Sequence, residues 1–223
     1  MTTLVIDRSS THPSFALFDG ANLLCTHTWE GEPTRAPEWL SDMRARILAE
    51  GVAFSSIGTY VCGLGPGSFS GIRACLAAVN GMALPTRTPV YGIASAAALA
   101  SQQPDDQVTV VGDARRNRLW FVTYCKATPA KALTLLNGER PTHTADDFQL
   151  VEAEHLASSV PTESRMVSPD WNRLDTFLKT HVAASRLLQH PVSVSAEQLG
   201  RLALADPSAL KLEPSPIYLH PAV

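Results

Sequence analysis

The residues most suggestive of binding or catalysis lie at positions 65–71. They read GPGSFSG and stand between an apolar strand and a helix. A glycine loop in this setting can direct backbone N–H groups at a phosphate. The phosphate-loop pattern requires a Gly-Lys pair, however, and Lys126 is the first lysine of the chain. The nucleophile elbow requires a central serine, where this chain has Phe69. The dinucleotide spacing is also missed by one residue. The pattern therefore favours a structural loop, formed by Gly65, Pro66, Gly67, Ser68, Phe69 and Gly71.

Histidines and cysteines supply no second catalytic pattern. The histidines stand at positions 12, 27, 143, 155, 181, 190 and 220, and none forms an HxxxH or HExxH pair that would place two metal ligands one helical turn apart. The cysteines at positions 25, 62, 75 and 125 form no CxxC pair, so we expect reduced thiols in a cytoplasmic protein. The sequence predicts no catalytic residue, no metal ligand and no cofactor of its own.

The helix after the loop, expected over residues 71–83, presents two different faces. Ser68 or Ser70 can cap its first turn, because a hydroxyl accepts from free backbone N–H groups. One face is an apolar stripe at three- and four-residue spacing, which indicates burial. The other face carries only small residues and would let another helix approach closely: Ala74, Ala77, Ala78 and Gly81.

A second helix is expected over residues 37–50, because proline suits the first turn and Gly51 ends the pattern. Trp39, Met43 and Ile47 recur every four residues along it. This stripe can face the core, or it can form part of a partner surface, since Trp and Met are favoured at interfaces. Arg73 opposes the positive end of the dipole of the first helix, so we expect it to have a structural partner such as a loop carbonyl or a carboxylate.

The chain opens with strands expected over residues 3–6, 14–18 and 23–28, a meander typical of actin-like nucleotide-binding domains. Those folds use an Asp at the end of the first strand to contact a metal-bound phosphate. Here Asp7 is followed by Arg8, Ser9 and Ser10 without a glycine, so a turn-capping carboxylate is the favoured interpretation of Asp7. The polar stretch around Pro104 predicts a boundary between a domain at 1–103 and a smaller one at 104–223.

Composition excludes several broad classes of protein. A hydrophobic content of 45% over 223 residues is enough for a substantial core. A net charge of −3 offers no general basic surface for nucleic acid. Arginines 115, 116 and 118 cluster before a strand expected at 117–125, where a solvated hairpin is favoured over a cationic spot for RNA. No apolar run reaches the roughly 20 residues of a membrane span, and no signal peptide is recognisable.

Four segments resemble the TsaB (YeaZ) family, a subunit of the bacterial machinery that makes threonylcarbamoyladenosine in tRNA. GPGSFSGIR at 65–73 is similar to the GPGSF-[TS]-G-[LVI]-R signature of that family. LVID at 4–7 resembles its opening strand, DARR at 113–116 its DARR segment, and PIYL at 216–219 its closing motif. Arg8 departs from the family, which usually has Thr at this place.

The resemblance implies an α/β fold with two actin-like (ASKHA, ribonuclease H-like) domains, each a mixed sheet flanked by helices. It implies a non-catalytic subunit that binds a TsaD-like catalytic subunit, which carries the His pair and metal, in a complex that includes a TsaE-like ATPase. The two helices described above would form a homodimer when the chain is alone, or the heterodimer. ATP would bind only at an interface with partner subunits, and tRNA only through the complex.

Two other functions are kept open. The first is an autonomous ATP-dependent small-molecule kinase of actin-like fold, which lacks support because the phosphate-loop glycine is missing after Asp7. The second is a glycoprotease-like peptidase, against which the missing His pair counts. We expect the isolated chain to show no transferase or ATPase activity.

Overall fold

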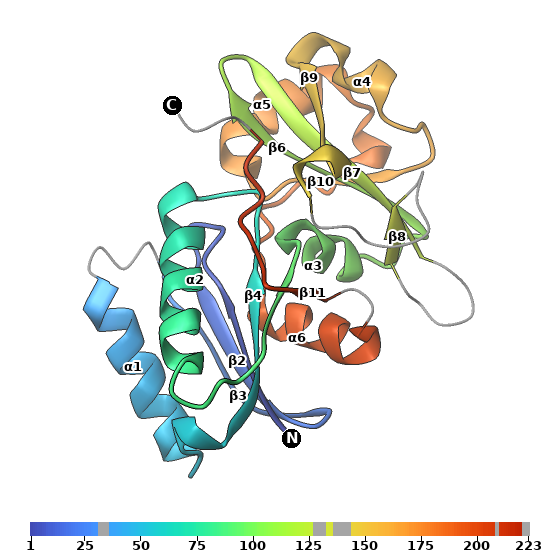
Figure 1. Cartoon of the computed structure of the whole chain (residues 1–223). Helices are drawn as coiled ribbons and strands as arrows, with labels where there is room; N and C mark the ends of the chain where they lie inside the picture. The colour runs from blue at the N-terminus through green and yellow to red at the C-terminus, as the bar shows by residue number, and fades with distance from the viewer. Residues whose placement is uncertain (31–35, 127–132, 136–143, 208–209, 220–223) are drawn as a thin grey trace. The chain divides into compact units, whose positions relative to one another are not determined.

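The computed structural model describes residues 1–30, 36–126, 133–135, 144–207 and 210–219. The chain divides into two compact units (Figure 1). The first comprises Met1–Ala98 and Val194–Ile217, and the second comprises Leu99–Ser193 and the residues from Tyr218 onward. The sequence-based division into 1–103 and 104–223 differs from this result, because Val194–Ile217 belongs with the first unit.

The first unit is built on a six-stranded mixed sheet with the order β11-β5-β4-β1-β2-β3. The central pairs β1–β4 and β4–β5 are parallel, and the pairs β1–β2, β2–β3 and β5–β11 are antiparallel. The strands are β1 (Thr2–Asp7), β2 (Ser14–Asp19), β3 (Asn22–Thr28), β4 (Ile57–Gly63), β5 (Val90–Ile93) and β11 (Lys211–Leu212). The opening three-stranded meander and the apolar strand before the glycine loop are confirmed, and that strand, β4, pairs parallel with β1.

Helices cover both faces of this sheet. Side chains of β2 identify what covers each face, because successive side chains of a strand point to opposite faces of the sheet. The Phe15 ring contacts Trp29, which contacts α1, whereas Phe18 packs beneath Gly200 of α6. The helices are α1 (Ala36–Ala49), α2 (Phe69–Ala83) and α6 (Ala196–Ala205), with α3 (Ser95–Ser101) following β5 and a 3-10 turn, η1 (Phe54–Ser56), before β4. α1 and α2 therefore lie on one face and α6 on the other (Figure 1).

The return of α6 to the first unit has a physical cause. Its buried side consists of Ala196, Leu199, Gly200, Leu202 and Ala203. Ser195 caps the helix by accepting from the backbone N–H of Gln198. Ala196 N donates to the buried Ser14 Oγ over 2.9 Å, which ties the start of α6 to β2. Pattern and capping were readable from the sequence, but the sheet on which the helix packs was not.

The second unit has its own sheet, with the order β10-β6-β7-β8 and β9 paired with β7. Both faces of β7 are buried, because Leu119 and Phe121 face one side, Trp120 and Val122 face the other, and all four are buried. The strands are β6 (Gln107–Arg115), β7 (Arg118–Lys126), β8 (Leu133–Leu135), β9 (Gln149–Glu152) and β10 (Arg165–Val167). The helices are α4 (Leu156–Ser159) and α5 (Trp171–His181), with 3-10 turns η2 (Ala145–Asp147), η3 (Ala153–His155) and η4 (Ala184–Arg186).

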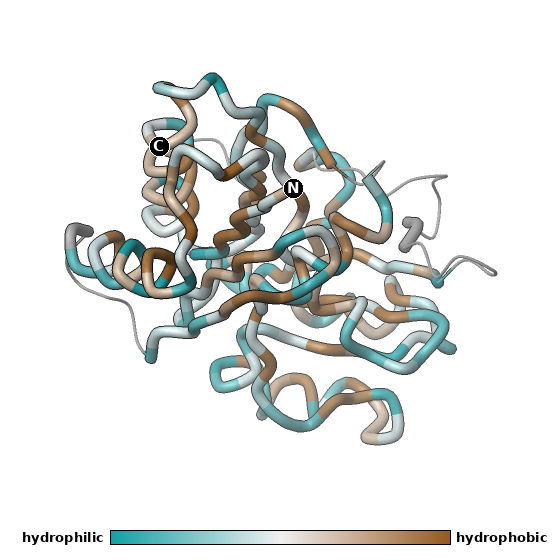
Figure 2. Tube along the Cα trace, turned by 90° about the horizontal axis from the view of Figure 1, so that it is seen from below, coloured by the Kyte–Doolittle hydropathy of each residue, from teal (hydrophilic) through white to brown (hydrophobic). Residues whose placement is uncertain are grey.

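Hydrophobic and hydrophilic segments alternate along the traces of the helices, as expected for helices with one buried side (Figure 2). Within the described ranges, none of the helices combines the length and the apolar character that crossing a membrane would need.

Candidate functional site

The glycine loop packs directly against the turn that follows β1. A Cβ atom on Gly67 would lie 2.0 Å from the backbone oxygen of Ser9, and one on Gly71 would lie 2.1 Å from that of Arg8. Ser68 N donates to Ser9 O over 2.7 Å, so the two segments are also hydrogen-bonded. No larger side chain fits at such distances. Glycine at these two positions therefore allows the turn after β1 to lie directly against the loop, which gives the loop a structural role.

The loop passes into α2 through the predicted serine cap. Ser68 Oγ accepts from Gly71 N over 3.2 Å, which satisfies one of the free N–H groups of the first turn. Of the two serines considered, Ser68 is therefore the cap, and α2 begins at Phe69, two residues earlier than expected.

Asp7 is fully buried at the end of β1 and holds three donors. Its Oδ1 accepts from Ser9 N and Ser9 Oγ, both at 2.8 Å, and its Oδ2 accepts from Ser95 Oγ at 2.6 Å. Burial raises the pKa of Asp7, and the hydrogen bonds from Ser95 and Ser9 oppose this shift. Ser95 Oγ also accepts from Gly65 N at 3.0 Å, so Asp7 connects the turn after β1 to the glycine loop. This geometry matches the turn-capping interpretation of Asp7.

The apolar stripe of α1 lies in the core, which corrects its assignment to the partner interface. Trp39 is 1% exposed, and Met43 and Ile47 are completely buried. The guanidinium of Arg8 lies 4.5 Å from the Trp39 ring centre, and the edge of Trp29 meets the same ring. The side chains of the stripe are therefore covered by residues of the first unit itself.

The small-residue face of α2, made of Ala74, Ala77, Ala78 and Gly81, lies at the surface of the first unit. Ala77 and Gly81 are exposed, and Ala74 and Ala78 are half-buried. A Cβ atom on Gly81 would meet nothing within 4 Å, so Gly81 does not pack against the sheet of its own unit. Whether this face binds a partner stays a prediction, but the structure leaves it accessible.

Phe69 and Arg73 form an exposed pair at the start of α2. Phe69 is 49% exposed, and the Arg73 guanidinium lies 5.0 Å from the centre of its ring. The expected partner of Arg73 was a carbonyl or a carboxylate, and the partner found is this aromatic ring. A cation–π contact at the surface contributes about 0.5–1 kcal/mol.

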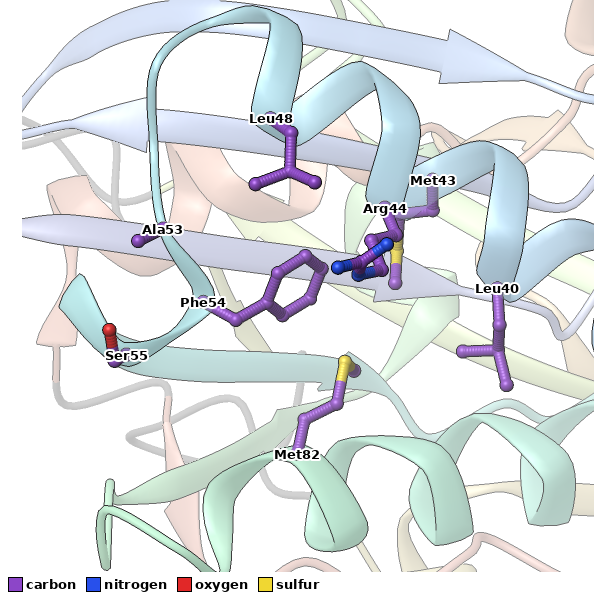
Figure 3. A pocket seen from close by; sticks show the side chains of 8 residues that line it. All are labelled: Leu40, Met43, Arg44, Leu48, Ala53, Phe54, Ser55 and Met82. Atoms are coloured by element: carbon purple, nitrogen blue, oxygen red, sulfur yellow. The ribbon is translucent and has the colours of Figure 1, made fainter.

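An open groove lies beside the small-residue face, between α1, η1 and α2 (Figure 3). Its volume is about 630 Å³. The α1–α2 groove is lined by Leu40, Met43, Arg44, Leu48, Ala53, Phe54, Ser55 and Met82. Only Met43 among these belonged to the predicted interface. The sequence pattern contains a signal for four of the other lining residues. Leu40, Arg44 and Leu48 repeat every four residues and form the helical row beside the buried stripe of α1, and Met82 stands one turn after Ala78.

Asp42 anchors α1 to the edge of the sheet. Its Oδ2 accepts from Trp29 Nε1 and from Arg46 Nε, both at 2.9 Å, and lies 3.7 Å from His27 Nε2. The hydrogen bond from Arg46 chiefly lowers the pKa of Asp42. Burial and the charge of Arg46 lower the pKa of His27. The cluster holds an ionised carboxylate between two donors, which fixes α1 over β3.

The arginine-rich turn of the second unit is held by neighbouring carboxylates. Arg115 and Arg118 lie 3.6 Å from Asp113 and Glu152 respectively, and Arg173 lies 3.3 Å from Asp113. Three consecutive residues, 115–117, have positive φ angles, which shapes the tight connection from β6 to β7. The solvated hairpin predicted here is the arrangement found.

No metal-binding group is visible within these described parts: no cluster of three or more His, Cys, Asp or Glu side chains is placed to hold an ion.

Comparison with known proteins places this geometry in a family. The family model for TsaD, tRNA N6-adenosine threonylcarbamoyltransferase, matches residues 36–200. YeaZ from Pseudomonas aeruginosa superposes with a TM-score of 0.68 at 22% identity, over 91% of this chain and 90% of that one. A second structure, an uncharacterized protein with similarity to peptidase YEAZ from Pseudomonas aeruginosa, superposes with a TM-score of 0.74 at 22% identity. The match covers 98% of this chain and 99% of that one.

Curated relatives match over a shorter stretch. The uncharacterized proteins Rv3421c of Mycobacterium tuberculosis (strain ATCC 25618 / H37Rv) and Mb3455c of Mycobacterium bovis (strain ATCC BAA-935 / AF2122/97) are 33% identical over 81 residues. This stretch is 36% of the present chain and spans 38% of the length of those relatives. The resemblance to YeaZ and the expected α/β fold, with mixed sheets flanked by helices, are confirmed. The chain therefore belongs to the TsaD family of tRNA N6-adenosine threonylcarbamoyltransferases, and within it has the fold of YeaZ.

Proposed function

We propose that this chain is a non-catalytic, TsaB-like scaffold subunit. It binds a TsaD-like catalytic subunit, and the pair transfers threonylcarbamoyl to the adenosine beside the tRNA anticodon. Membership of the TsaD family and the YeaZ fold support this role. The buried, fully hydrogen-bonded Asp7 supports it over the alternative of an autonomous kinase, since that carboxylate is engaged in holding the glycine loop.

The observation that carries the proposal is the accessible face of α2. The helix buries Ile72, Cys75, Leu76 and Val79 beneath it and presents the small-residue face outward. Glycine within a helix costs about 1 kcal/mol relative to alanine, and Gly81 gains no contact within its own unit in return. A helix from another molecule can approach such a surface closely, and the α1–α2 groove beside it supplies apolar area.

The same face serves a homodimer when the chain is alone, so self-association and binding of the catalytic subunit compete. A TsaE-like ATPase joins the complex at another surface. ATP binds at the interface with these partners, and tRNA is contacted only through the complex, in the cytoplasm.

The test uses one substitution on the proposed interface and one matched control. Ala78→Arg adds a long cation to the small-residue face, and Ala205→Arg adds the same group at an exposed position of α6, on the opposite face of the sheet. We expect both variants to fold, as judged by circular dichroism. Ala78→Arg should abolish self-association in sedimentation and co-purification with the TsaD-like subunit of the same organism, and Ala205→Arg should change neither.

A reconstituted assay of threonylcarbamoyladenosine formation checks the functional step. The isolated chain should show no transfer and no ATP hydrolysis above background, and it should restore transfer when added to the catalytic subunit. Transfer by the catalytic subunit without this chain, or nucleotide turnover by this chain that Asp7→Ala removes, would contradict the scaffold role. An unfolded Ala78→Arg variant would show that the face belongs to the core.

A further inference from the structure

We propose that the turn connecting β6 to β7, residues 115–118, contacts the phosphate backbone of tRNA within the complex, and that Arg116 makes the principal contact. These four residues are called the arginine tip below (Figure 1). The inference rests on the proposed function, because that function supplies tRNA as the ligand. It adds the surface of this chain that the tRNA meets.

The arginine tip is built against the preferences of its backbone. Arg115, Arg116 and Asn117 have φ angles of 66°, 54° and 61°, in the left-handed region that glycine adopts most readily. Arg115 and Arg118 stand directly opposite each other in the pairing of β6 with β7, which places two like charges together. Glycine or asparagine at the left-handed positions would make a more favourable hairpin. Backbone strain of this kind is concentrated at functional sites, so the guanidinium groups rather than the turn explain the arginines.

Neighbouring carboxylates already engage two of the three arginines. Arg115 lies 3.6 Å from Asp113, and Arg118 lies 3.6 Å from Glu152. Arg116 is exposed and forms no ion pair with any carboxylate of the described residues. Its guanidinium, solvated in the free chain, can therefore take an anionic partner without breaking an existing ion pair.

The base of the arginine tip is held from both sides. Asp113 N donates to Asp170 Oδ2 over 2.9 Å, and Arg115 N donates to Asp113 Oδ1 over 2.7 Å. On the other side, Ala153 N donates to Asn117 O over 3.1 Å. A turn that is fixed before binding loses less conformational entropy when a ligand arrives.

The exposed groups of the tip fit a phosphate backbone better than a protein. Its three exposed residues, Arg115, Arg116 and Asn117, are all polar. A protein interface has an apolar centre, which these residues do not provide. A guanidinium forms bidentate hydrogen bonds with a phosphate, and an asparagine side chain can donate to phosphate or sugar oxygens. Because the whole chain has a net charge of −3, the tip holds tRNA only together with the catalytic subunit.

Substitution by glycine separates the backbone of the tip from its charge. Arg116→Gly removes the guanidinium but suits the positive φ angle, so it should not lower the melting temperature. Arg116→Lys retains a positive charge at the same position.

Arg87 offers a matched control for the glycine variant. It is exposed, has a φ angle of 53° and belongs to the first unit. The nearest cationic residues along the sequence are Arg73 and Arg115, so Arg87 stands in no cluster of arginines in its own segment. Arg87→Gly therefore makes the same change of backbone and of net charge outside the arginine tip.

The experiment measures binding of a tRNA transcript to the complex of the full-length chain with the TsaD-like subunit of the same organism. The transcript carries adenosine beside the anticodon, and fluorescence anisotropy follows binding between about 50 and 200 mM salt. We expect Arg116→Gly to weaken binding about tenfold at low salt and to make the log–log salt dependence shallower by about one. Arg116→Lys should keep the wild-type salt dependence. Arg87→Gly should match the wild type in affinity and in salt dependence.

The outcomes separate this inference from the function on which it rests, because co-purification of each variant with the catalytic subunit is measured in parallel. If the wild-type complex binds tRNA and Arg116→Gly leaves affinity and salt dependence unchanged, the RNA contact is overturned and the scaffold function stands. Loss of co-purification in Arg116→Gly would make the tip a protein contact, and an equal loss of tRNA affinity in Arg87→Gly would reduce the effect to net charge. Either result overturns the inference. If the wild-type chain does not bind the catalytic subunit, or their complex binds no tRNA, both proposals fail.

Discussion

The α carbon of Gly71 faces the backbone oxygen of Arg8 so closely that a Cβ atom would lie 2.1 Å away from that oxygen. This approach lets α2 begin directly against the turn after β1. Gly81, ten residues further along the same helix, has nothing within 4 Å of the corresponding position. The two glycines therefore occupy one helix for opposite physical reasons.

Alanine substitutions at these two positions should have effects of opposite sign. Gly71→Ala forces the backbone of the turn to move and should destabilise the fold by at least about 2 kcal/mol. Gly81→Ala adds a methyl group in open space and improves helix propensity, so it should stabilise the fold by about 0.5–1 kcal/mol. Urea unfolding of the two variants measures both. Equal changes in the free energy of unfolding for the two variants would show that close packing against Arg8 is not the reason for glycine at position 71.

Asp7 should respond differently to two substitutions. Asp7→Ala leaves the Ser9 N–H and the hydroxyl groups of Ser9 and Ser95 without their acceptor in a buried site, and should cost about 3 kcal/mol. Asp7→Asn keeps an oxygen for Ser9 and presents an NH₂ group to Ser95, and should cost about 1 kcal/mol. Thermal unfolding checks the order of the two variants. A fully stable Asp7→Ala protein would remove the capping role.

The local pattern of the sequence was sufficient for much of the first unit. Period-two strands, serine caps and the buried stripe of α2 depend on neighbouring residues, and such signals are readable along the chain. The exposed small-residue face of α2 followed in the same way. The structural loop was predicted because the spacing failed every phosphate-binding pattern, and the packing of Gly67 on Ser9 explains why glycine is needed there.

Contacts between distant segments could not be read from local patterns. An apolar stripe such as Trp39 and Met43 indicates burial but does not say whether its own sheet or another molecule covers it. The answer depends on Arg8 and Trp29, which reach Trp39 from elsewhere in the fold. The return of α6 to the first sheet and the groove formed by α1, η1 and α2 are likewise products of tertiary packing.

The stability of the first unit should depend on the protonation of His27. Burial and Arg46 lower the pKa of His27 below the usual 6.5, so the unfolded chain binds the proton more readily. Stability should therefore fall as the pH drops through 6.5 toward the lower pKa of the folded state. Asp42 stays ionised in this range, because its pKa is lowered below 3.8 chiefly by the hydrogen bond from Arg46.

The measurement for His27 compares urea unfolding of the wild type and His27→Gln between pH 7.5 and pH 5. The variant should lose less stability over this interval, and the difference isolates His27 from the other histidines. Identical pH profiles of the two proteins would show that the environment of His27 contributes nothing to stability.

Met43 and Leu48 test the division of α1 into a buried and an exposed side. Met43 is completely buried, so Met43→Ala leaves a cavity and should cost about 2–5 kcal/mol. Leu48 is 44% exposed, so Leu48→Ala should change stability by less than about 1 kcal/mol while it removes apolar area from the α1–α2 groove. Binding of the TsaD-like subunit should weaken in the stable Leu48→Ala protein. If Met43→Ala were instead stable and deficient in binding, the stripe of α1 would belong to the interface after all.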